Sequence, residues 1–138
     1  MVKTSNFTVE TRGESELDDI TSYVENELRK SGLREGLATI FVSGSTAGIT
    51  TVEFEPGLIK DIKRVFEKLV PEGDRYAHND TWHDGNGHSH VRSSILKTSL
   101  SVPFQDAKLL LGTWQQIVLI DFDNRKRSRK VIAQFIGE

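Results

Sequence analysis

Histidine and carboxylate side chains gather in one stretch of this amino-acid sequence. All four histidines lie between His78 and His90, and Asp80 and Asp84 lie among them. The chain has no cysteine, so imidazole and carboxylate are the ligands it can offer to zinc, manganese or iron. His88 and His90 are two residues apart, so an extended backbone would place both rings on one face, where a flexible loop could add His78. The stretch predicts a site for a divalent cation, with zinc as first choice and magnesium or manganese as alternatives.

The same stretch has a second interpretation, which stays open. Histidines in a solvated polar loop can do no more than complete turns, and a single histidine would favour that view. Four histidines in one loop favour metal binding or catalysis. His83 stands beside Trp82 and is left outside the predicted site.

A loop of small residues offers a candidate anion site. Residues 43–48 follow an apolar run, and their backbone amides, with the hydroxyls of Ser45 and Thr46, could form a concave nest for an anion. The loop lacks both the P-loop lysine and the dinucleotide-binding spacing of glycines. A β-bulge that needs glycine for backbone reasons alone is an equal alternative.

Charged residues near two predicted strands add further candidates. One glutamate of the pair Glu53 and Glu55 could act as a general base, although carboxylates at strand ends are usually solvated. Residues 125–130 form a basic run, Arg-Lys-Arg-Ser-Arg-Lys. Such a run is usually a solvated surface, yet alternate arginines on one strand face, here Arg127 and Arg129, can grip phosphate through paired hydrogen bonds.

A hairpin corner is predicted from Leu111 to Gln116. In this corner Trp114 could form the wall of a pocket, and Thr113 and Gln115 could offer hydrogen bonds. Taken alone, a tryptophan at this position is more typical of the core than of a ligand contact.

Composition limits the class of protein. The chain has 138 residues, 36% hydrophobic and 28% charged, which suits one folded domain over residues 1–138. A formal net charge of -2, and a basic run without interleaved aromatic residues, argue against nucleic acid as a partner. No segment resembles a signal peptide or a membrane span, so we expect a cytoplasmic protein without a membrane partner.

Two main helices are predicted from apolar spacing. The first starts at a capping box formed by Ser15 and Asp18 and ends at Gly32. The second starts at Pro56 and stops at Pro71. Their apolar faces consist of Leu17, Ile20, Val24 and Leu28 in the first and of Leu58, Ile59, Ile62, Phe66 and Leu69 in the second.

The other apolar segments predict β-strands. Residues 2–10 form the first, and the runs 37–43 and 49–54 are expected in the centre of the sheet. After a long loop over 72–90 and a short helix over 91–96, an antiparallel meander is predicted from strands at 100–104, 108–111, 114–122 and 130–136. The expected fold is α+β: an antiparallel β-sheet sandwich packed with two main helices.

These motifs together resemble the YjbQ-like family over nearly the whole chain. The residues that carry the resemblance are Gly44-Ser45-Thr46-Ala47, Glu53, Asp84-Gly85-Asn86, His88, His90, Ser99 through Pro103, and Leu111-Gly112-Thr113-Trp114-Gln115. The resemblance implies a sandwich that assembles as a homotrimer, with pockets near the subunit interfaces lined by the histidine loop. Members are commonly labelled secondary thiamine-phosphate synthase enzymes.

The resemblance also implies roles for individual residues. The implied metal ligands are His78, His88 and His90, and the implied catalytic residues are Glu53, Thr46 and Asn86. The residues that would bind the substrate and its phosphate are Gly44, Ser45, Thr113, Trp114, Gln115, Arg127 and Arg129. Many relatives have His-Thr where this chain has Gly44-Ser45, so one imidazole is replaced here.

Three functional hypotheses follow. The first is a secondary thiamine-phosphate synthase, which joins small phosphorylated heterocycles while a divalent cation offsets the charge of departing pyrophosphate. The second is a metal-dependent hydrolase of small phosphate esters or lactones, in which Glu53 takes a proton from metal-bound water. The third is a trimeric module that binds a small phosphorylated molecule without reaction.

Overall fold

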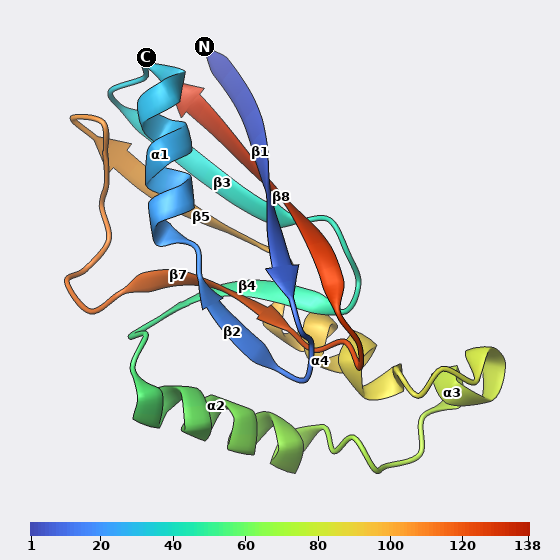
Figure 1. Cartoon of the computed structure of the whole chain (residues 1–138). Coiled ribbons are helices and arrows are strands. Elements are labelled where there is room, and N and C mark those ends of the chain that lie inside the picture. The colour runs from blue at the N-terminus through green and yellow to red at the C-terminus, as the bar shows by residue number, and fades with distance from the viewer.

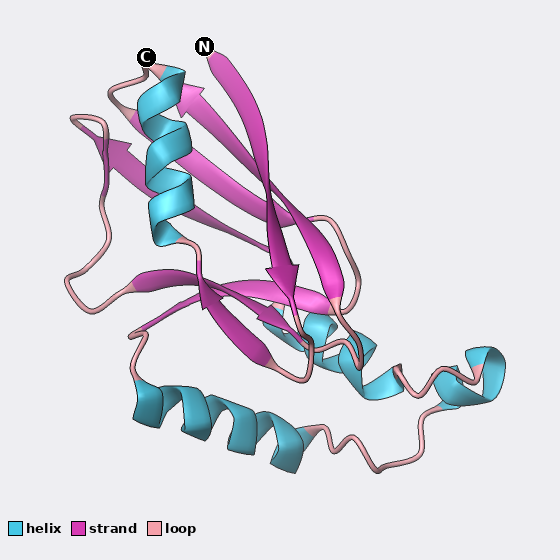
Figure 2. Cartoon of the chain, in the orientation of Figure 1, coloured by secondary structure: helices cyan, strands magenta, loops and turns pink.

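Two antiparallel β-sheets and four helices make up the computed structural model, which describes residues 1–138 (Figures 1 and 2). The strands are β1 (Val2–Thr11), β2 (Glu16–Asp19), β3 (Gly36–Val42), β4 (Ala47–Val52), β5 (Ser99–Gln105), β6 (Lys108–Leu109), β7 (Gln116–Asp121) and β8 (Arg127–Gly137). The helices are α1 (Thr21–Ser31), α2 (Pro56–Leu69), α3 (Ala77–Trp82) and α4 (Gly87–Leu96). The predicted α+β class with antiparallel pairing is confirmed.

The three-stranded sheet, in the order β2-β7-β4, lies between α2 on one side and α1 with the five-stranded sheet on the other (Figure 1). On one face, Ile117 and Leu119 of β7 join the main core, which is shared with α1 and the five-stranded sheet β1-β8-β3-β5-β6. On the other face, Val118 and Ile120 pack towards α2. Strand β7 is therefore buried on both faces, which explains its unbroken apolar sequence.

Strand positions differ in part from the prediction. Strand β3 lies in the centre of its sheet, as expected, but β4 pairs only with β7 and is an edge strand. The predicted meander is also wrong: β5 and β6 form a hairpin, β7 joins the other sheet, and β8 returns between β1 and β3. Local turn signals do not show which sheet a strand joins, because that depends on which apolar faces meet.

The first helix starts later than predicted. Residues Glu16–Asp19 pair with β7, and α1 begins only at Thr21. Ser15 has a positive φ of 62°, whereas an N-cap residue needs an extended backbone. Asp19 Oδ1 instead accepts hydrogen bonds from the amide of Thr21 at 3.0 Å and from its hydroxyl at 2.7 Å. The predicted capping box is wrong because Leu17 belongs to a strand and is buried towards α2.

The second main helix matches the prediction. Pro56 opens α2, and the carboxylate of Glu55 accepts hydrogen bonds from the amides of Gly57 and Leu58 at 2.7 and 2.8 Å. These hydrogen bonds hold the pKa of Glu55 below its ordinary value. The helix packs on the three-stranded sheet through Ile59, Ile62 and Phe66.

The histidine-rich segment is more regular than predicted. It contains α3, and α4 already begins at Gly87, before the short helix expected from Val91. His88 and His90 are therefore helical residues. None of the helices in the chain is long and apolar enough to cross a membrane.

Candidate functional site

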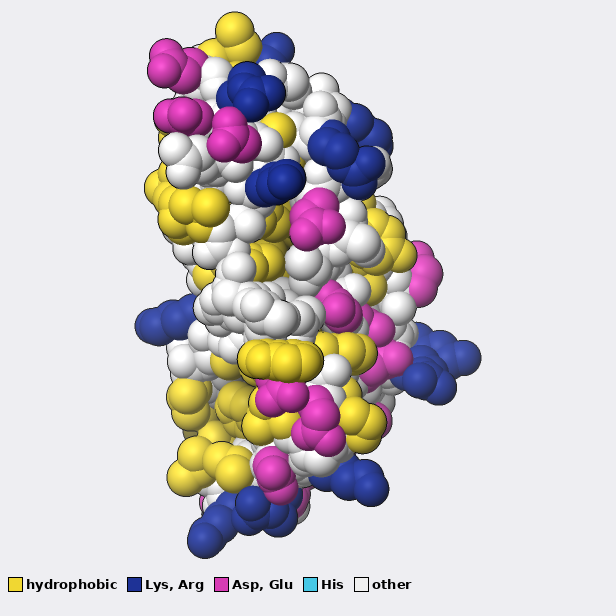
Figure 3. Space-filling model, turned by 90° about the vertical axis from the view of Figure 1, so that its left-hand side faces the viewer, with side chains coloured by type: hydrophobic (Ala, Val, Ile, Leu, Met, Phe, Trp, Pro, Cys, Tyr) yellow, Lys and Arg dark blue, Asp and Glu magenta, His cyan; other side chains and the backbone are white.

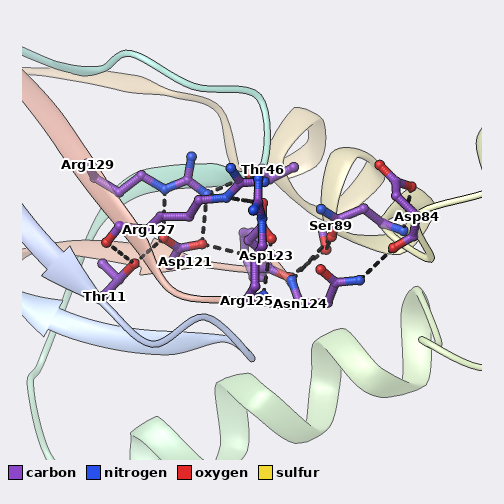
Figure 4. A network of polar contacts seen from close by, with 12 residues as sticks. Thr11, Thr46, Asp84, Ser89, Asp121, Asp123, Asn124, Arg125, Arg127 and Arg129 are labelled. Atoms are coloured by element: carbon purple, nitrogen blue, oxygen red, sulfur yellow. Dashed lines mark hydrogen bonds and ion pairs between the residues drawn. The ribbon is translucent and has the colours of Figure 1, made fainter. Parts of the chain in front are cut away.

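A buried polar network lies at one end of the three-stranded sheet (Figure 4). Arg129 on β8 donates two hydrogen bonds to Asp121 on β7, from Nε to Oδ2 at 2.6 Å and from Nη2 to Oδ1 at 2.8 Å. Nη2 also donates to Thr46 Oγ1 at 2.6 Å, and Thr11 Oγ1 donates to Asp121 Oδ2 at 2.5 Å. The Arg129–Asp121 pair thus links strands β1, β7 and β8 with the β3–β4 loop.

A second carboxylate, Asp123, completes the network. Its Oδ2 accepts hydrogen bonds from Thr46 Oγ1 at 2.9 Å and from Arg127 Nε at 3.0 Å. Burial alone would raise the pKa of Asp123, but hydrogen bonds from Thr46, Asn86 and Arg127 outweigh it, so the pKa lies below its ordinary value. Asp123 is therefore ionised, and Asp121 and Asp123 face the guanidinium groups of Arg127 and Arg129.

Helix α4 is anchored beside this network. The hydroxyl of Ser89 lies 2.6 Å from Asn86 Oδ1 and 2.6 Å from the carbonyl oxygen of Phe122. Ser93 Oγ donates to the carbonyl oxygen of Ala47 at 2.5 Å, which ties the middle of α4 to β4. The backbone amide of Asn124 donates to Asn86 Oδ1 at 3.2 Å. These contacts fix the face of α4 that looks towards the β3–β4 loop.

A pocket of about 480 Å³ opens between the β3–β4 loop and α4. Its lining residues are Gly44, Ser45, His90, Ser93, Ser94, Lys97 and Thr98. None of them is hydrophobic and none is acidic, whereas Lys97 supplies a positive charge. The lining therefore suits a small anionic ligand better than an apolar one.

Two of the predicted histidines lie next to one another, and one of them, His90, lines this pocket. The rings of His78 on α3 and His90 on α4 have centroids 4.3 Å apart, and His78 Nδ1 lies 3.6 Å from Asp84 Oδ1. Burial lowers the pKa of His90, and the neighbouring His78 lowers it further. His90 is therefore neutral at pH 7 and can accept a proton.

The third predicted ligand, His88, does not join them. Residues two apart on an α-helix are separated by about 200° around the axis, so His88 and His90 leave α4 on different sides. His88 is 1% exposed, and its ring centroid lies 6.5 Å from that of Tyr76. Burial and the nearby charge of Arg92 lower the pKa of His88.

The side chains present do not fit a three-histidine metal centre within one chain. No group of three or more histidine, aspartate or glutamate side chains is arranged to hold a metal ion. His78 and His90, with Asp84, are the groups that could contribute ligands. The chemistry of the pocket is therefore better described through its hydrogen-bond donors and its neutral imidazole.

Comparison with known proteins identifies the family. The family model described as UPF0047 protein YjbQ-like matches residues 5–138. A UPF0047 protein of Archaeoglobus fulgidus is 37% identical over 128 residues, which cover 93% of this chain and 97% of the relative. This chain belongs to the UPF0047 (YjbQ-like) family. YugU of Bacillus subtilis, another UPF0047 protein, is 35% identical, and the match covers 99% of this chain and 100% of YugU.

Two solved structures share the fold. A hypothetical protein from Aeropyrum pernix superposes with a TM-score of 0.91 at 34% identity, covering 99% of each chain. A YbjQ-like protein of unknown function from Sulfolobus solfataricus gives a TM-score of 0.90 at 32% identity, covering 100% of each chain. The names of these proteins state no activity.

None of the residues 111–115 lines the histidine pocket. Gln115 lines a second pocket of about 330 Å³ between β4 and β5, which shares Lys97 with the first, and Gln115 Nε2 donates to Thr51 Oγ1 at 3.1 Å. Trp114 is 73% exposed rather than part of the core, so that expectation is wrong. Thr113 and Glu53 are exposed and line neither pocket.

The remaining predicted residues lie around the buried network. Thr46, Asn86, Arg127 and Arg129 all take part in it, and Gly44 and Ser45 form the adjacent pocket wall. Sequence reasoning missed Asp121 and Asp123, although carboxylates that end an apolar strand are a signal for a polar site. It also missed Thr11, because nothing in the N-terminal strand distinguishes that residue from other threonines.

Proposed function

We propose that this UPF0047 protein is an enzyme that acts on small phosphorylated heterocycles, as a secondary thiamine-phosphate synthase would. The observation that carries the proposal is the pocket of about 480 Å³ whose lining contains Lys97 and His90 and no acidic residue. Phosphate is recognised by cationic side chains, hydroxyls and backbone amides, and this lining offers all three.

The histidine pair orients the substrate in this proposal. The thiazole nitrogen attacks the methylene carbon of the pyrimidine diphosphate through its lone pair, and the carbon–oxygen bond to pyrophosphate breaks, so no proton leaves the attacking group. His90 lines the pocket and is neutral at pH 7, so its imidazole accepts a hydrogen bond from the amino group of the pyrimidine and orients it. His78 packs against His90 and lies near Asp84. Lys97 and the serine hydroxyls of α4 hold the phosphate groups and stabilise the charge of the leaving pyrophosphate.

Synthesis from two substrates tests the proposal directly. The purified full-length chain is incubated with a pyrimidine diphosphate and a thiazole phosphate, with and without zinc or magnesium, and thiamine phosphate is measured by chromatography. We expect product with wild-type protein and a loss of about a hundredfold in His90→Ala, which loses the group that orients the pyrimidine. The exposed His83→Ala is the matched control and should keep the wild-type rate. Absence of product with every metal added rejects synthase activity.

Hydrolysis is the second candidate, and the neutral His90 favours it as well. A neutral imidazole beside a polar pocket can activate water directly, without the exposed Glu53. A phosphate ester incubated alone distinguishes the two reactions. Release of inorganic phosphate in the absence of a second substrate supports a hydrolase, whereas turnover that requires both substrates supports the synthase.

We also propose that the chain assembles as a homotrimer, as the family resemblance implies. Leu110 and Trp114, in the loop before β7, are 55% and 73% exposed. Figure 3 shows hydrophobic side chains on the face where this loop lies, and no histidine is visible there. Light scattering on the purified chain should give three times the mass of one chain, and Trp114→Ser should reduce it. A wild-type monomer would contradict this.

A further inference from the structure

One buried arginine has an unused hydrogen-bond donor. The side chain of Arg129 is 8% exposed, and its Nε and Nη2 are held by Asp121 and Thr46. Nη1 has no hydrogen-bond partner in the chain, and in Figure 4 one terminal nitrogen of Arg129 carries no dashed line. Nη1 is also not among the fully buried unpaired atoms, so it keeps some access to solvent.

The free donor lies beside a residue without a side chain. A Cβ atom added to Gly44 would stand 2.8 Å from Arg129 Nη1 and 3.8 Å from its Cζ. Gly44 also lines the pocket that contains His90 and Lys97. Arg129 itself does not line the pocket, so a ligand in the pocket would reach Nη1 through the space that the missing side chain leaves at Gly44.

Backbone geometry does not require glycine at this position. The glycines with a positive φ are Gly13, Gly32, Gly36 and Gly85, and Gly44 is not one of them. Any L-residue could adopt the backbone conformation of Gly44 without strain. What glycine provides here is open space in front of a guanidinium nitrogen.

Hydrogen bonds of the other two guanidinium nitrogens fix the direction of Nη1. The paired hydrogen bonds to Asp121 hold the guanidinium plane, and Asp123 Oδ2 lies 3.7 Å from Nη2. Thr46 bonds both to Arg129 and to Asp123, so the arginine cannot rotate without breaking several contacts. A donor held in this way binds an oxygen atom at one position, which favours a specific ligand over solvent.

We propose that Gly44 and Arg129 form an oxyanion subsite, in which Nη1 donates to one negatively charged phosphate oxygen of the ligand. Gly44 determines specificity, because any side chain there closes the approach to Nη1. Lys97 contacts the ligand from the pocket wall, so a diphosphate is bound by two separate cations. Asp121 is a positioning residue that acts through Arg129. This subsite rests on the proposed function, since it shares the pocket and the ligand class.

Calorimetric titration of the full-length chain with inorganic pyrophosphate tests the subsite. Gly44→Val fills the space, and Arg129→Lys keeps a cation beside Asp121 but has no Nη1. We expect each variant to bind pyrophosphate about tenfold to a hundredfold more weakly than wild type. Gly73→Ala is the matched control, because nothing lies within 4 Å of its added Cβ, and it should bind as wild type does.

The outcomes separate this inference from the proposed function. Wild-type affinity in Gly44→Val, or in Arg129→Lys, overturns the subsite. If Lys97→Gln loses affinity in that case, the phosphate pocket itself still stands. No binding of pyrophosphate or phosphate by the wild-type chain rejects both. Should Gly44→Val melt at a lower temperature without ligand, Arg129→Lys decides the question by itself.

Discussion

Two buried arginines, Arg92 and Arg129, have nearly equal exposure but different surroundings. Their side chains are 6% and 8% exposed. All three nitrogens of Arg92 have partners: Nε and Nη2 donate to the carbonyl oxygen of Val70, Nη1 to Ser15 Oγ, and Nη2 also to Glu67. Arg129 leaves Nη1 free.

The difference shows what each arginine does. Arg92 links α4 to the end of α2 and to the β1–β2 turn, and each of its three nitrogens takes part. Arg129 is held by carboxylates, and one of its donors is left for a ligand. Burial of an arginine therefore does not indicate function, whereas an unused donor on a rigidly held arginine does.

The largest effect is expected from Arg129→Met. This change leaves Asp121, which is 0% exposed, without its main cation, and an uncompensated buried carboxylate is strongly unfavourable. We expect the free energy of unfolding in urea to fall by about 3 to 5 kcal/mol. Changing Asp121 to Asn in the same chain should recover part of this loss. A fall equal to that of a surface substitution would show that the network is solvated.

Arg92→Met should have a smaller effect on stability and none on ligand binding. The change leaves the carbonyl oxygen of Val70 and the hydroxyl of Ser15 without a partner, whereas Glu67 is largely exposed and regains water. We expect a loss of about 2 kcal/mol by urea unfolding. Pyrophosphate titration of the same variant should give wild-type affinity. Weakened binding there would remove the contrast between the two arginines.

The sequence predicted those parts of the fold that depend on local chemistry. Pro56 and the carboxylate of Glu55 define the start of α2 through contacts within one turn, so that helix was found. Leu17 and Ile20 suit a strand and a helix equally well, and only the pairing of β2 with β7 decides between them. The helical spacing of these apolar residues therefore led to a predicted start of α1 that is too early.

The candidate site was also predicted only in part, because local patterns do not show how distant segments meet. Ser45 and His90 were predicted as members of an anion site and a metal site, and they line one pocket. The positions of His88 and His90 were expected on an extended backbone, yet α4 turns them to different sides. The pairing of Asp121 with Arg129 depends on the course of the chain between two sheets, and no local pattern reveals it.

The pKa of Asp18 depends in part on the charge of Asp121, the partner of Arg129. Burial raises the pKa of Asp18 to about 6, and repulsion from Glu16 and Asp121 adds to the shift. A raised folded-state pKa means that protonation favours the folded chain, so wild type should gain stability as the pH falls from about 6 to about 4. Asp18→Asn lacks this gain. Between pH 6 and pH 4, the free energy of unfolding of wild type should therefore rise by about 1 kcal/mol more than that of Asp18→Asn. Parallel urea curves at each pH would contradict the shift.

The pKa of His88 depends in part on the charge of Arg92, and its shift has the opposite sign to that of Asp18. Burial and then Arg92 lower the folded-state pKa of His88, so the unfolded chain binds the proton more readily. Stability is therefore present above the ordinary histidine pKa of about 6.5 and is lost as the pH falls below it. Between pH 7.5 and 5.5, wild type should lose about 1 kcal/mol more than His88→Gln. Asp18 is present in both proteins, so its opposing contribution cancels when His88→Gln is compared with wild type at the same pH.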